Sequence, residues 1–157
     1  MEYLILDLDN TLISLIEHKE IGGVDFVVEI TDPFTKKITA VGIRKRPYLD
    51  FFLNFVSKKY KLIIWSNGSS EYVHKVLTGI NTVTHFCNVI TRDTFCKLPI
   101  KDLRDLKTLM SVNLNNVLFI DDTPEHIIGL KEHQIIVAPK YTGIYDTFLI
   151  DIIYHLV

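Results

Sequence analysis

Two carboxylates and a hydroxyl group follow an apolar run near the start of the chain. Residues 3–6 are apolar or aromatic, and Asp7, Asp9 and Thr11 come after them. Such a run is typical of a buried parallel strand, and in open α/β sheets ligand chemistry lies beyond the carboxyl ends of the strands. An aspartate there could act as a nucleophile or bind a hard cation, and a second could deliver or take a proton. The plainer alternative is that both acids only solvate a strand end and cap a helix.

The same pattern of an apolar run ending in polar residues recurs twice. The runs at 60–65 and 116–120 end in Ser66 with Asn67 and in Asp121 with Asp122, respectively. Because right-handed crossovers bring the carboxyl ends of parallel strands to one edge of the sheet, we expect these side chains to share one cleft. Four carboxylates in one cleft repel one another strongly unless a cation is present. The sequence therefore predicts a hard divalent metal with oxygen ligands, Mg²⁺ by preference.

A lysine in such a cleft would hold both the nucleophile and a phosphate group. Lys101, which directly precedes Asp102 and Leu103, is the best-placed candidate. Lys97 is the alternative, and we favour Lys101 over it.

The chain is expected to alternate strands and helices after one interruption. Residues 12–23 are predicted to be a loop or short irregular helix, and residues 24–30 and 38–43 a β-hairpin joined by a turn-rich connection. The patterns then predict strands at 60–65, 87–91, 116–120 and 135–137, with helices starting near 47, at about 70–77, at 102–110, at 124–132 and from about 145. We therefore expect an α/β fold, a three-layer Rossmann-like sandwich with a central parallel sheet and a hairpin inserted at about 24–43. The whole chain, 1–157, is predicted to be a single catalytic domain.

Composition restricts the classes of protein that fit. The net charge is −2, which argues against binding nucleic acid by broad phosphate neutralisation. Two cysteines without C-x-x-C spacing indicate neither a disulfide framework nor a zinc site. No apolar stretch approaches the roughly 18 residues of a membrane span, and no signal peptide is recognisable. We expect a protein that is intracellular, cytoplasmic or nuclear, without a membrane partner.

These motifs, in this order, resemble those of haloacid dehalogenase-type phosphatases. The relevant residues are Asp7, Asp9 and Thr11, then Ser66, Lys101, and the Asp121–Asp122 pair. More narrowly, Arg46–Pro47 before a helix and the 120–124 stretch are similar to one branch. That branch comprises the small phosphatases of the RNA polymerase II carboxy-terminal domain, also called the NLI-interacting-factor-like domain. The resemblance covers essentially the whole chain.

The resemblance implies a two-step phosphoryl transfer. Asp7 would form an aspartyl-phosphate, and Asp9 would protonate the leaving oxygen and then activate water. Mg²⁺ would be held by the Asp7 side chain, the Asp9 backbone carbonyl and Asp122, with Asp121 either a ligand or a support for one. The phosphate-binding residues implied are Thr11, Ser66, Asn67 and Lys101. The substrate contacts implied are Val28, Ile30 and Tyr72.

At two motif positions this sequence differs from the residue that is usual in the family. Asn10 occupies a position where Glu is usual, and Ser66 one where Thr is more frequent. We expect a Mg²⁺-dependent phosphomonoesterase acting on phosphoserine or phosphothreonine in a protein or peptide. A phosphatase for nucleotides or nucleic-acid 3′-ends is the alternative within enzymes. A catalytically inactive relative that binds phosphoproteins is the alternative outside them.

Overall fold

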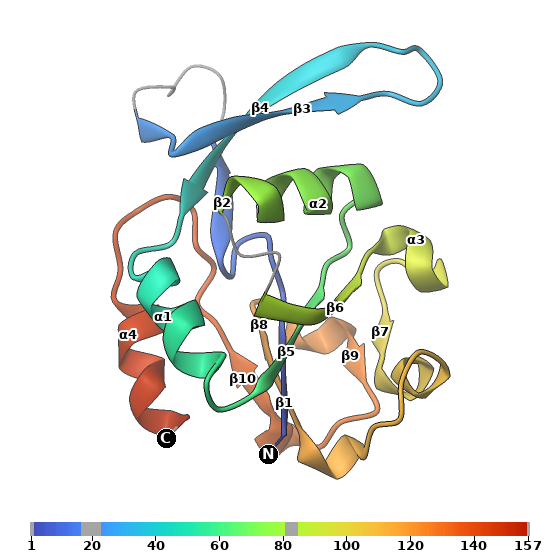
Figure 1. Ribbon diagram of the computed structural model, residues 1–157, viewed down its shortest axis with the longest axis vertical. Helices are drawn as coiled ribbons and strands as arrows, with labels where there is room; N and C mark the ends of the chain where they lie inside the picture. The colour runs from blue at the N-terminus through green and yellow to red at the C-terminus, as the bar shows by residue number, and fades with distance from the viewer. Residues whose placement is uncertain (1, 17–22, 81–84, 157) are drawn as a thin grey trace.

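The computed structural model describes residues 2–16, 23–80 and 85–156, and its centre is a parallel sheet of five strands. In spatial order these are β10 (Ile135–Val137), β8 (Val117–Asp121), β1 (Tyr3–Leu6), β5 (Lys61–Trp65) and β6 (Phe86–Ile90). All four pairings are parallel, and Figure 1 shows β1 running between its neighbours through the middle of the molecule. The predicted α/β class with a central parallel sheet is therefore confirmed.

Both faces of this sheet are covered, which explains why β1 is apolar along its whole length. Successive side chains alternate between faces, so Leu4 and Leu6 belong to one core and Tyr3 and Ile5 to the other. The first core packs against α1 (Leu49–Val56), α2 (Ser70–Gly79) and α4 (Phe148–Ile152). The second packs against the 3₁₀ helix η3 (Leu103–Thr108). These are the three layers expected from the sequence.

The inserted hairpin forms where it was predicted, but it belongs to a three-stranded sheet. β3 (Phe26–Thr31) and β4 (Ile38–Lys45) pair antiparallel, and Figure 1 shows them extending across α2. β2 (Ile13–Ile16) pairs with the other edge of β4, so the predicted loop or irregular helix at 12–23 is wrong for these four residues. β4 is long enough to bind strands on both edges, a pairing that local sequence does not reveal. Residues 17–22 of that prediction lie outside the described part of the chain.

The predicted helix at 124–132 is also wrong. The segment instead forms a single 3₁₀ turn η5 (Pro124–His126), strand β9 (Ile127–Ile128) and another turn η6 (Glu132–Gln134). β9 pairs in parallel with β7 (Lys101–Asp102), which the sequence did not predict. The β-branched isoleucines suit this ladder, and Gly129, with a φ of 92°, ends it.

Smaller differences concern the kind and start of helices. The 102–110 segment is helical but forms the 3₁₀ helix η3, and the closing helix begins at Phe148 and ends in η7 (Ile153–His155). Two short elements add to the connections, namely α3 (Arg92–Phe95) and η4 (Leu114–Asn116). Among the residues described, no helix is long and apolar enough to cross a membrane.

Candidate active site

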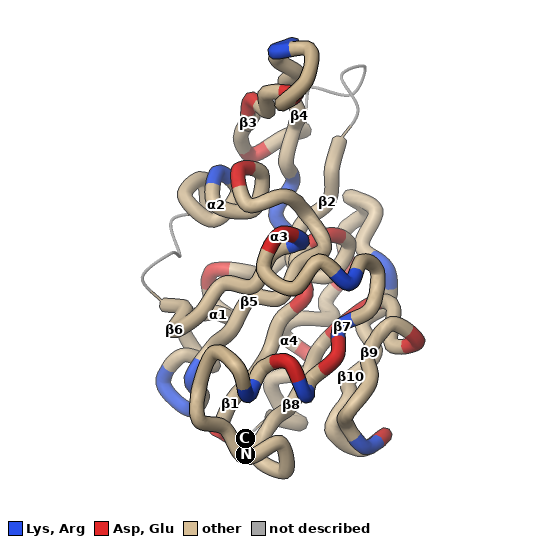
Figure 2. The backbone as a smooth tube through the Cα atoms, turned by 90° about the vertical axis from the view of Figure 1, so that its right-hand side faces the viewer, with Lys and Arg blue, Asp and Glu red and all other residues tan. Residues whose placement is uncertain are grey.

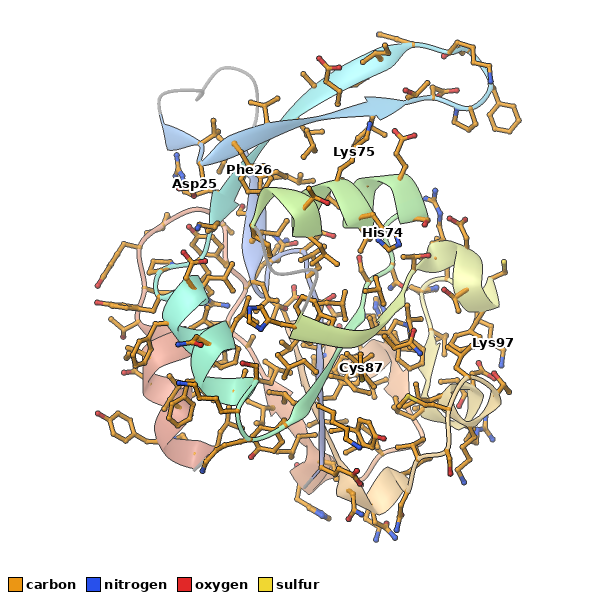
Figure 3. The ribbon with its side chains drawn as sticks, in the orientation of Figure 1. Asp25, Phe26, His74, Lys75, Cys87 and Lys97 are labelled. Atoms are coloured by element: carbon orange, nitrogen blue, oxygen red, sulfur yellow. The ribbon has the colours of Figure 1, made fainter. Side chains whose placement is uncertain are left out.

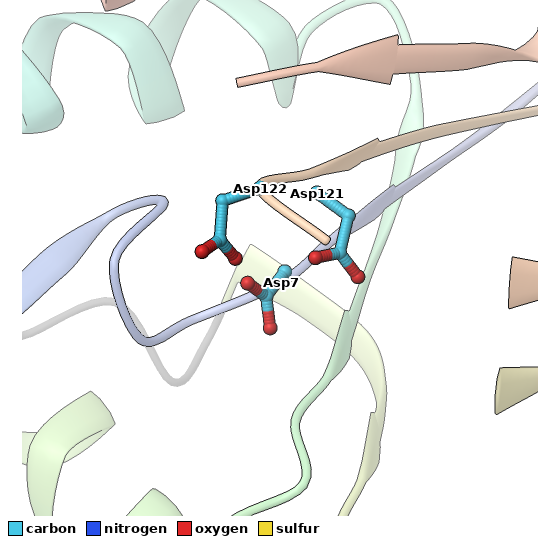
Figure 4. Close-up of side chains that lie close together, drawn as sticks. All are labelled: Asp7, Asp121 and Asp122. Atoms are coloured by element: carbon cyan, nitrogen blue, oxygen red, sulfur yellow. The ribbon is translucent and has the colours of Figure 1, made fainter. Parts of the chain in front are cut away.

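Two adjacent strand ends bring three carboxylates together. β1 pairs with β8 so that Leu6 lies opposite Ile120, and the next residues along are Asp7 on one strand and Asp121 and Asp122 on the other. Each of the three aspartates offers a carboxylate oxygen, and these oxygens lie within 4.8 Å of one another. Figure 4 shows the three carboxylates converging. They line a cavity of about 330 Å³, which Asp9 also lines.

Lys101 supplies a buried positive charge at the centre of this cluster. Its ammonium lies 2.9 Å from Oδ1 of Asp7 and 2.7 Å from Oδ2 of Asp121. Burial alone would lower the pKa of Lys101, but the charges of the two carboxylates outweigh it and raise that pKa. Lys97 instead pairs with Asp105 at 2.8 Å on the surface. The structure therefore brings Lys101 into the site and leaves Lys97 outside.

Thr11 ties the two strand ends together from the loop after β1. Its fully buried hydroxyl lies 2.8 Å from Oδ2 of Asp7 and 3.4 Å from Oδ1 of Asp122. The loop turns at Asn10, whose φ of 63° is left-handed. Asn adopts that conformation more readily than most residues, which gives a physical reason for asparagine here. The amide of Asn10 also donates to the carbonyl of Tyr141 at 3.0 Å.

Asp9 is held by a tyrosine from another element. The hydroxyl of Tyr72, in the first turn of α2, donates a hydrogen bond to Oδ1 of Asp9. Burial raises the pKa of Asp9 to about 6, with the negative charge of Asp7 adding to the effect and the Tyr72 hydrogen bond opposing it. A carboxyl group with this pKa can both give and take a proton near neutral pH.

The remaining carboxylates show that negative charge is in excess. Burial, followed by the interactions with Asp7 and Asp121, raises the pKa of Asp122 to about 7. Burial and the charge of Asp7 also raise the pKa of Asp121, although Lys101 opposes this. The single ammonium of Lys101 does not balance the four carboxylates that line the cavity. The three carboxylates that converge could each offer an oxygen atom to a metal ion. This donor set fits a hard divalent cation, which Asp7, Asp121 and Asp122 could hold.

The other predicted phosphate-binding residues differ in their access to the cavity. Asn67 lines it, and its amide also donates to the carbonyl of Pro99 at 3.1 Å. Ser66 is buried, its Oγ accepts a hydrogen bond from the backbone N–H of Gly68 at 3.0 Å, and it is not among the lining residues. Thr11 likewise acts behind the carboxylates rather than on the cavity wall.

The predicted substrate contacts are distributed over different surfaces. Val28 is buried, and Ile30 lines a second cavity of about 660 Å³ that also touches Ser69 and Ser70. Neither Val28 nor Ile30 lines the carboxylate cavity, and their role stays a prediction.

Sequence reasoning missed four residues that line the carboxylate cavity: Asn10, Gly68, Thr123 and His126. The first three are adjacent in sequence to motif residues, and this adjacency could have indicated that they line the cavity. His126 reaches the site only because residues 124–126 form a 3₁₀ turn.

The chain is similar in sequence and in structure to known proteins. A family model described as NLI interacting factor-like phosphatase matches residues 2–157. Phosphatase PSR1 of Saccharomyces cerevisiae is 27% identical over 152 residues, which cover 96% of this chain and 34% of that protein. A probable C-terminal domain small phosphatase of Dictyostelium discoideum is 25% identical over 155 residues, covering 98% of this chain and 49% of that protein.

The similarity extends to a solved structure. The structure of Fcp1, described as an essential RNA polymerase II CTD phosphatase, superimposes with a TM-score of 0.77 at 26% identity, over 92% of this chain and 44% of that one. The chain thus spans half or less of the length of these relatives. Because the family model matches almost every residue, and the motifs that suggested the family converge in one cavity, the chain belongs to the NLI interacting factor-like phosphatases.

Proposed function

We propose that this chain is a phosphomonoesterase that works through an aspartyl-phosphate on Asp7 and acts on phosphoserine or phosphothreonine in proteins. The observation that carries the proposal is the ammonium of Lys101, bonded at once to Asp7 and Asp121 beside Asp122. This arrangement places a positive charge against a buried carboxylate at the end of β1 and orients that carboxylate, which an attacking group requires. The names of the relatives support the same class of reaction.

Proton movements in this reaction fall to Asp9. A carboxylate oxygen of Asp7 attacks phosphorus while the bond from phosphorus to the leaving oxygen breaks, and the protonated Asp9 gives its proton to that oxygen. Asp9, now ionised, then takes a proton from water as the water attacks the phosphorus of the aspartyl-phosphate. This attack releases phosphate and restores Asp7. The pKa of Asp9, raised to about 6, suits both steps.

The charge balance supports a bound Mg²⁺. Asp7, Asp122 and Asp121 would hold the ion, together with the backbone carbonyl of Asp9. When bound, Mg²⁺ would neutralise the negative charge that the phosphoryl group brings to the carboxylate cluster. Lys101 and Asn67, which line the cavity, would contact the phosphoryl oxygens. The buried hydroxyls of Ser66 and Thr11 would support the site from behind, because Thr11 donates to Asp7 and Asp122 and Ser66 accepts from the N–H of Gly68.

The surroundings of the cavity favour a peptide substrate. The second cavity, between the hairpin and α2, combines apolar Ile30 and Val41 with charged side chains of both signs, namely Arg92, Asp32, Glu71 and Asp93. An extended peptide next to the phosphorylated residue could bury apolar side chains there, with Val28 as a further proposed contact. Figure 2 shows Lys and Arg interspersed with Asp and Glu along the described backbone, rather than gathered in the long basic stripe that nucleic acid would need.

Two assays test this proposal. Hydrolysis of p-nitrophenyl phosphate with and without Mg²⁺ separates an enzyme from a phosphoprotein-binding relative, and Asp7→Asn serves as the inactive control. Comparison of phosphoserine peptides with nucleoside 3′-phosphates then separates the two enzyme classes. We expect Mg²⁺-dependent turnover and a higher kcat/KM for the peptides. No turnover in the presence of Mg²⁺ would reject an enzyme, and faster hydrolysis of 3′-phosphates would reject the peptide substrate.

A further inference from the structure

Tyr72 lies where it can control the geometry of Asp9. Its hydroxyl donates to Oδ1 of Asp9, and the tyrosine is only 7% exposed, so its ring offers little surface to a substrate. Within the described part of the chain, this is the one side-chain hydrogen bond made by the Asp9 carboxyl group. Burial and the adjacent negative charge of Asp9 raise the pKa of Tyr72, so the hydroxyl stays a neutral donor.

The helix that carries Tyr72 is fixed at its first turn. The hydroxyl of Ser69 caps it by accepting from the backbone N–H of Tyr72 at 3.3 Å. The N–H of Ser70 donates to Asp93 at 3.1 Å, which ties the same turn to α3. Tyr72 is therefore held by its backbone as well as by its hydroxyl.

The hairpin holds the same helix from the other side. The carboxylate of Glu71 accepts from the N–H of Thr31 at 2.7 Å, and the ammonium of Lys75 donates to the carbonyl of Glu29 at 2.6 Å. Glu71 and Lys75 thus supply an acceptor and a donor to the edge of β3, as a neighbouring strand would. Figure 3 shows Lys75 between α2 and the hairpin. The helix that carries Tyr72 is consequently held by two other elements, α3 and β3.

We propose that Tyr72 is a positioning residue for proton transfer by Asp9, rather than a substrate contact. By occupying Oδ1, the hydroxyl fixes the plane of the carboxyl group and leaves Oδ2 to exchange the proton with the leaving oxygen and with water. This inference rests on the proposed function, because it assigns a role within that reaction. A misplaced acid costs rate only where the leaving group needs a proton, so the effect must depend on the leaving group.

Tyr72→Phe tests this role, because it removes the hydroxyl and keeps the ring. We expect kcat for a phosphoserine peptide to fall by about 10- to 100-fold with little change in KM, whereas kcat for p-nitrophenyl phosphate falls less than about 3-fold. The matched control is Tyr60→Phe, which removes a tyrosine hydroxyl that donates to the carbonyl of Leu156 at 2.8 Å, outside the site. This control should leave kcat unchanged for both the phosphoserine peptide and p-nitrophenyl phosphate.

Three kinetic outcomes would overturn the proposal. Equal losses on both substrates would mean that Tyr72 only supports the fold. A raised KM for the peptide with kcat unchanged would mean that it binds substrate. Unchanged kcat and KM for both substrates would mean that proton transfer by Asp9 does not require the Tyr72 hydroxyl.

A measurement independent of turnover separates this inference from the proposed function. In proton NMR spectra, the Tyr72 hydroxyl should give a downfield, slowly exchanging resonance that is absent in Tyr72→Phe and shifted in Asp9→Asn. If the wild-type protein hydrolyses neither substrate, the proposed function fails while this resonance still reports the contact. A Tyr72 hydroxyl resonance unaffected by Asp9→Asn would overturn the positioning role.

Discussion

Arg46 forms a two-point ion pair with Asp146, one hundred residues later in the chain. The guanidinium side chain is fully buried, and its Nε and Nη2 lie 3.1 Å and 2.8 Å from the two carboxylate oxygens. The third contact, from Nη1 to the carbonyl of Thr11 at 3.0 Å, reaches the loop that carries Asp9. The guanidinium also lies 4.5 Å from the ring centroid of Phe148. The segment that carries Asp146 therefore supports the loop that carries Asp9 through one arginine.

Removal of Asp146 should be strongly destabilising. Asp146→Ala leaves a buried cation without its ionic partner, and because the Asp146 side chain is 33% exposed we expect a loss near the lower end of the about 3–5 kcal/mol of unfolding free energy typical of buried pairs. The matched control is Asp50→Ala, because Asp50 pairs with Lys45 at 2.9 Å but is 68% exposed. Exposed pairs contribute about 0–1 kcal/mol. Urea denaturation of both variants measures the difference, and equal midpoints would contradict the structural importance of Arg46.

Asp7→Asn should abolish turnover and leave the protein folded. The amide keeps the shape of the side chain but cannot form an acyl phosphate. Lys101 retains its bond to Asp121, so the site does not acquire an unpaired charge. Activity assays and circular dichroism check both parts. Asp105→Asn, which changes a surface partner of Lys97, is the control and should keep full activity. Substantial turnover by a folded Asp7→Asn variant would rule out the nucleophile.

Mg²⁺ should bind more weakly at acidic pH. Metal binding requires ionised carboxylates, and in the metal-free protein the pKa of Asp122 is raised to about 7. Protons therefore compete with the metal as pH falls through 7. Isothermal titration calorimetry at pH 6 and pH 8 measures the effect directly. An affinity independent of pH would show that Asp122 does not titrate with metal binding.

Bound Mg²⁺ should also stabilise the fold. A ligand at about one hundred times its Kd adds about 2.7 kcal/mol to the free energy of unfolding. Asp122→Asn should lose most of this gain in unfolding free energy, and Asp105→Asn should retain it. Thermal unfolding with and without Mg²⁺ measures the gain for each variant.

Ca²⁺ should replace Mg²⁺ poorly in catalysis, because it prefers longer bonds and more ligands. Activity that persists in EDTA would show that the carboxylate cluster does not need a metal.

Activity on poor leaving groups should fall as pH rises above about 6. Asp9 must be protonated when the leaving oxygen departs, and its raised pKa means that the acid form prevails only below that value. The kcat/KM for a phosphoserine peptide should follow this titration. Asp9→Asn should slow phosphoserine far more than p-nitrophenyl phosphate, whose phenolate leaves with little help.

Pre-steady-state kinetics give the sharper measurement of Asp9. In Asp9→Asn, the initial burst of p-nitrophenol should persist while hydrolysis of the aspartyl-phosphate slows, and the burst from phosphoserine should disappear. Loss of both bursts would reject a role as general acid.

Long apolar runs made most of the fold predictable. β1, β5 and β8 are largely buried on both faces, so their sequences are apolar except for Lys61 at the start of β5 and Asp121 at the end of β8, and they are easily recognised. β2, β7 and β9 have two to four residues and exist because of partners elsewhere in the chain. No local pattern encodes such pairing, and this is why the predictions failed at 13–16 and 127–128.

The sequence by itself determined which residues end the central strands, and a parallel sheet then brings those ends together. That was sufficient to place Asp7, Asp121 and Asp122 in one cluster. The sequence also favoured Lys101 over Lys97, and the tertiary structure adds how Lys101 is positioned, because β7 binds β9 and so brings this lysine to the cluster.

Contacts between distant elements were likewise decided only by the folded chain. The hydrogen bond from Tyr72 to Asp9 joins residues 63 positions apart, and the pair of Arg46 with Asp146 spans 100. Strand periodicity reports which side chains are buried, since burial follows from the local backbone and the faces it presents. It does not report which buried polar groups meet, because that depends on how separate elements pack against one another.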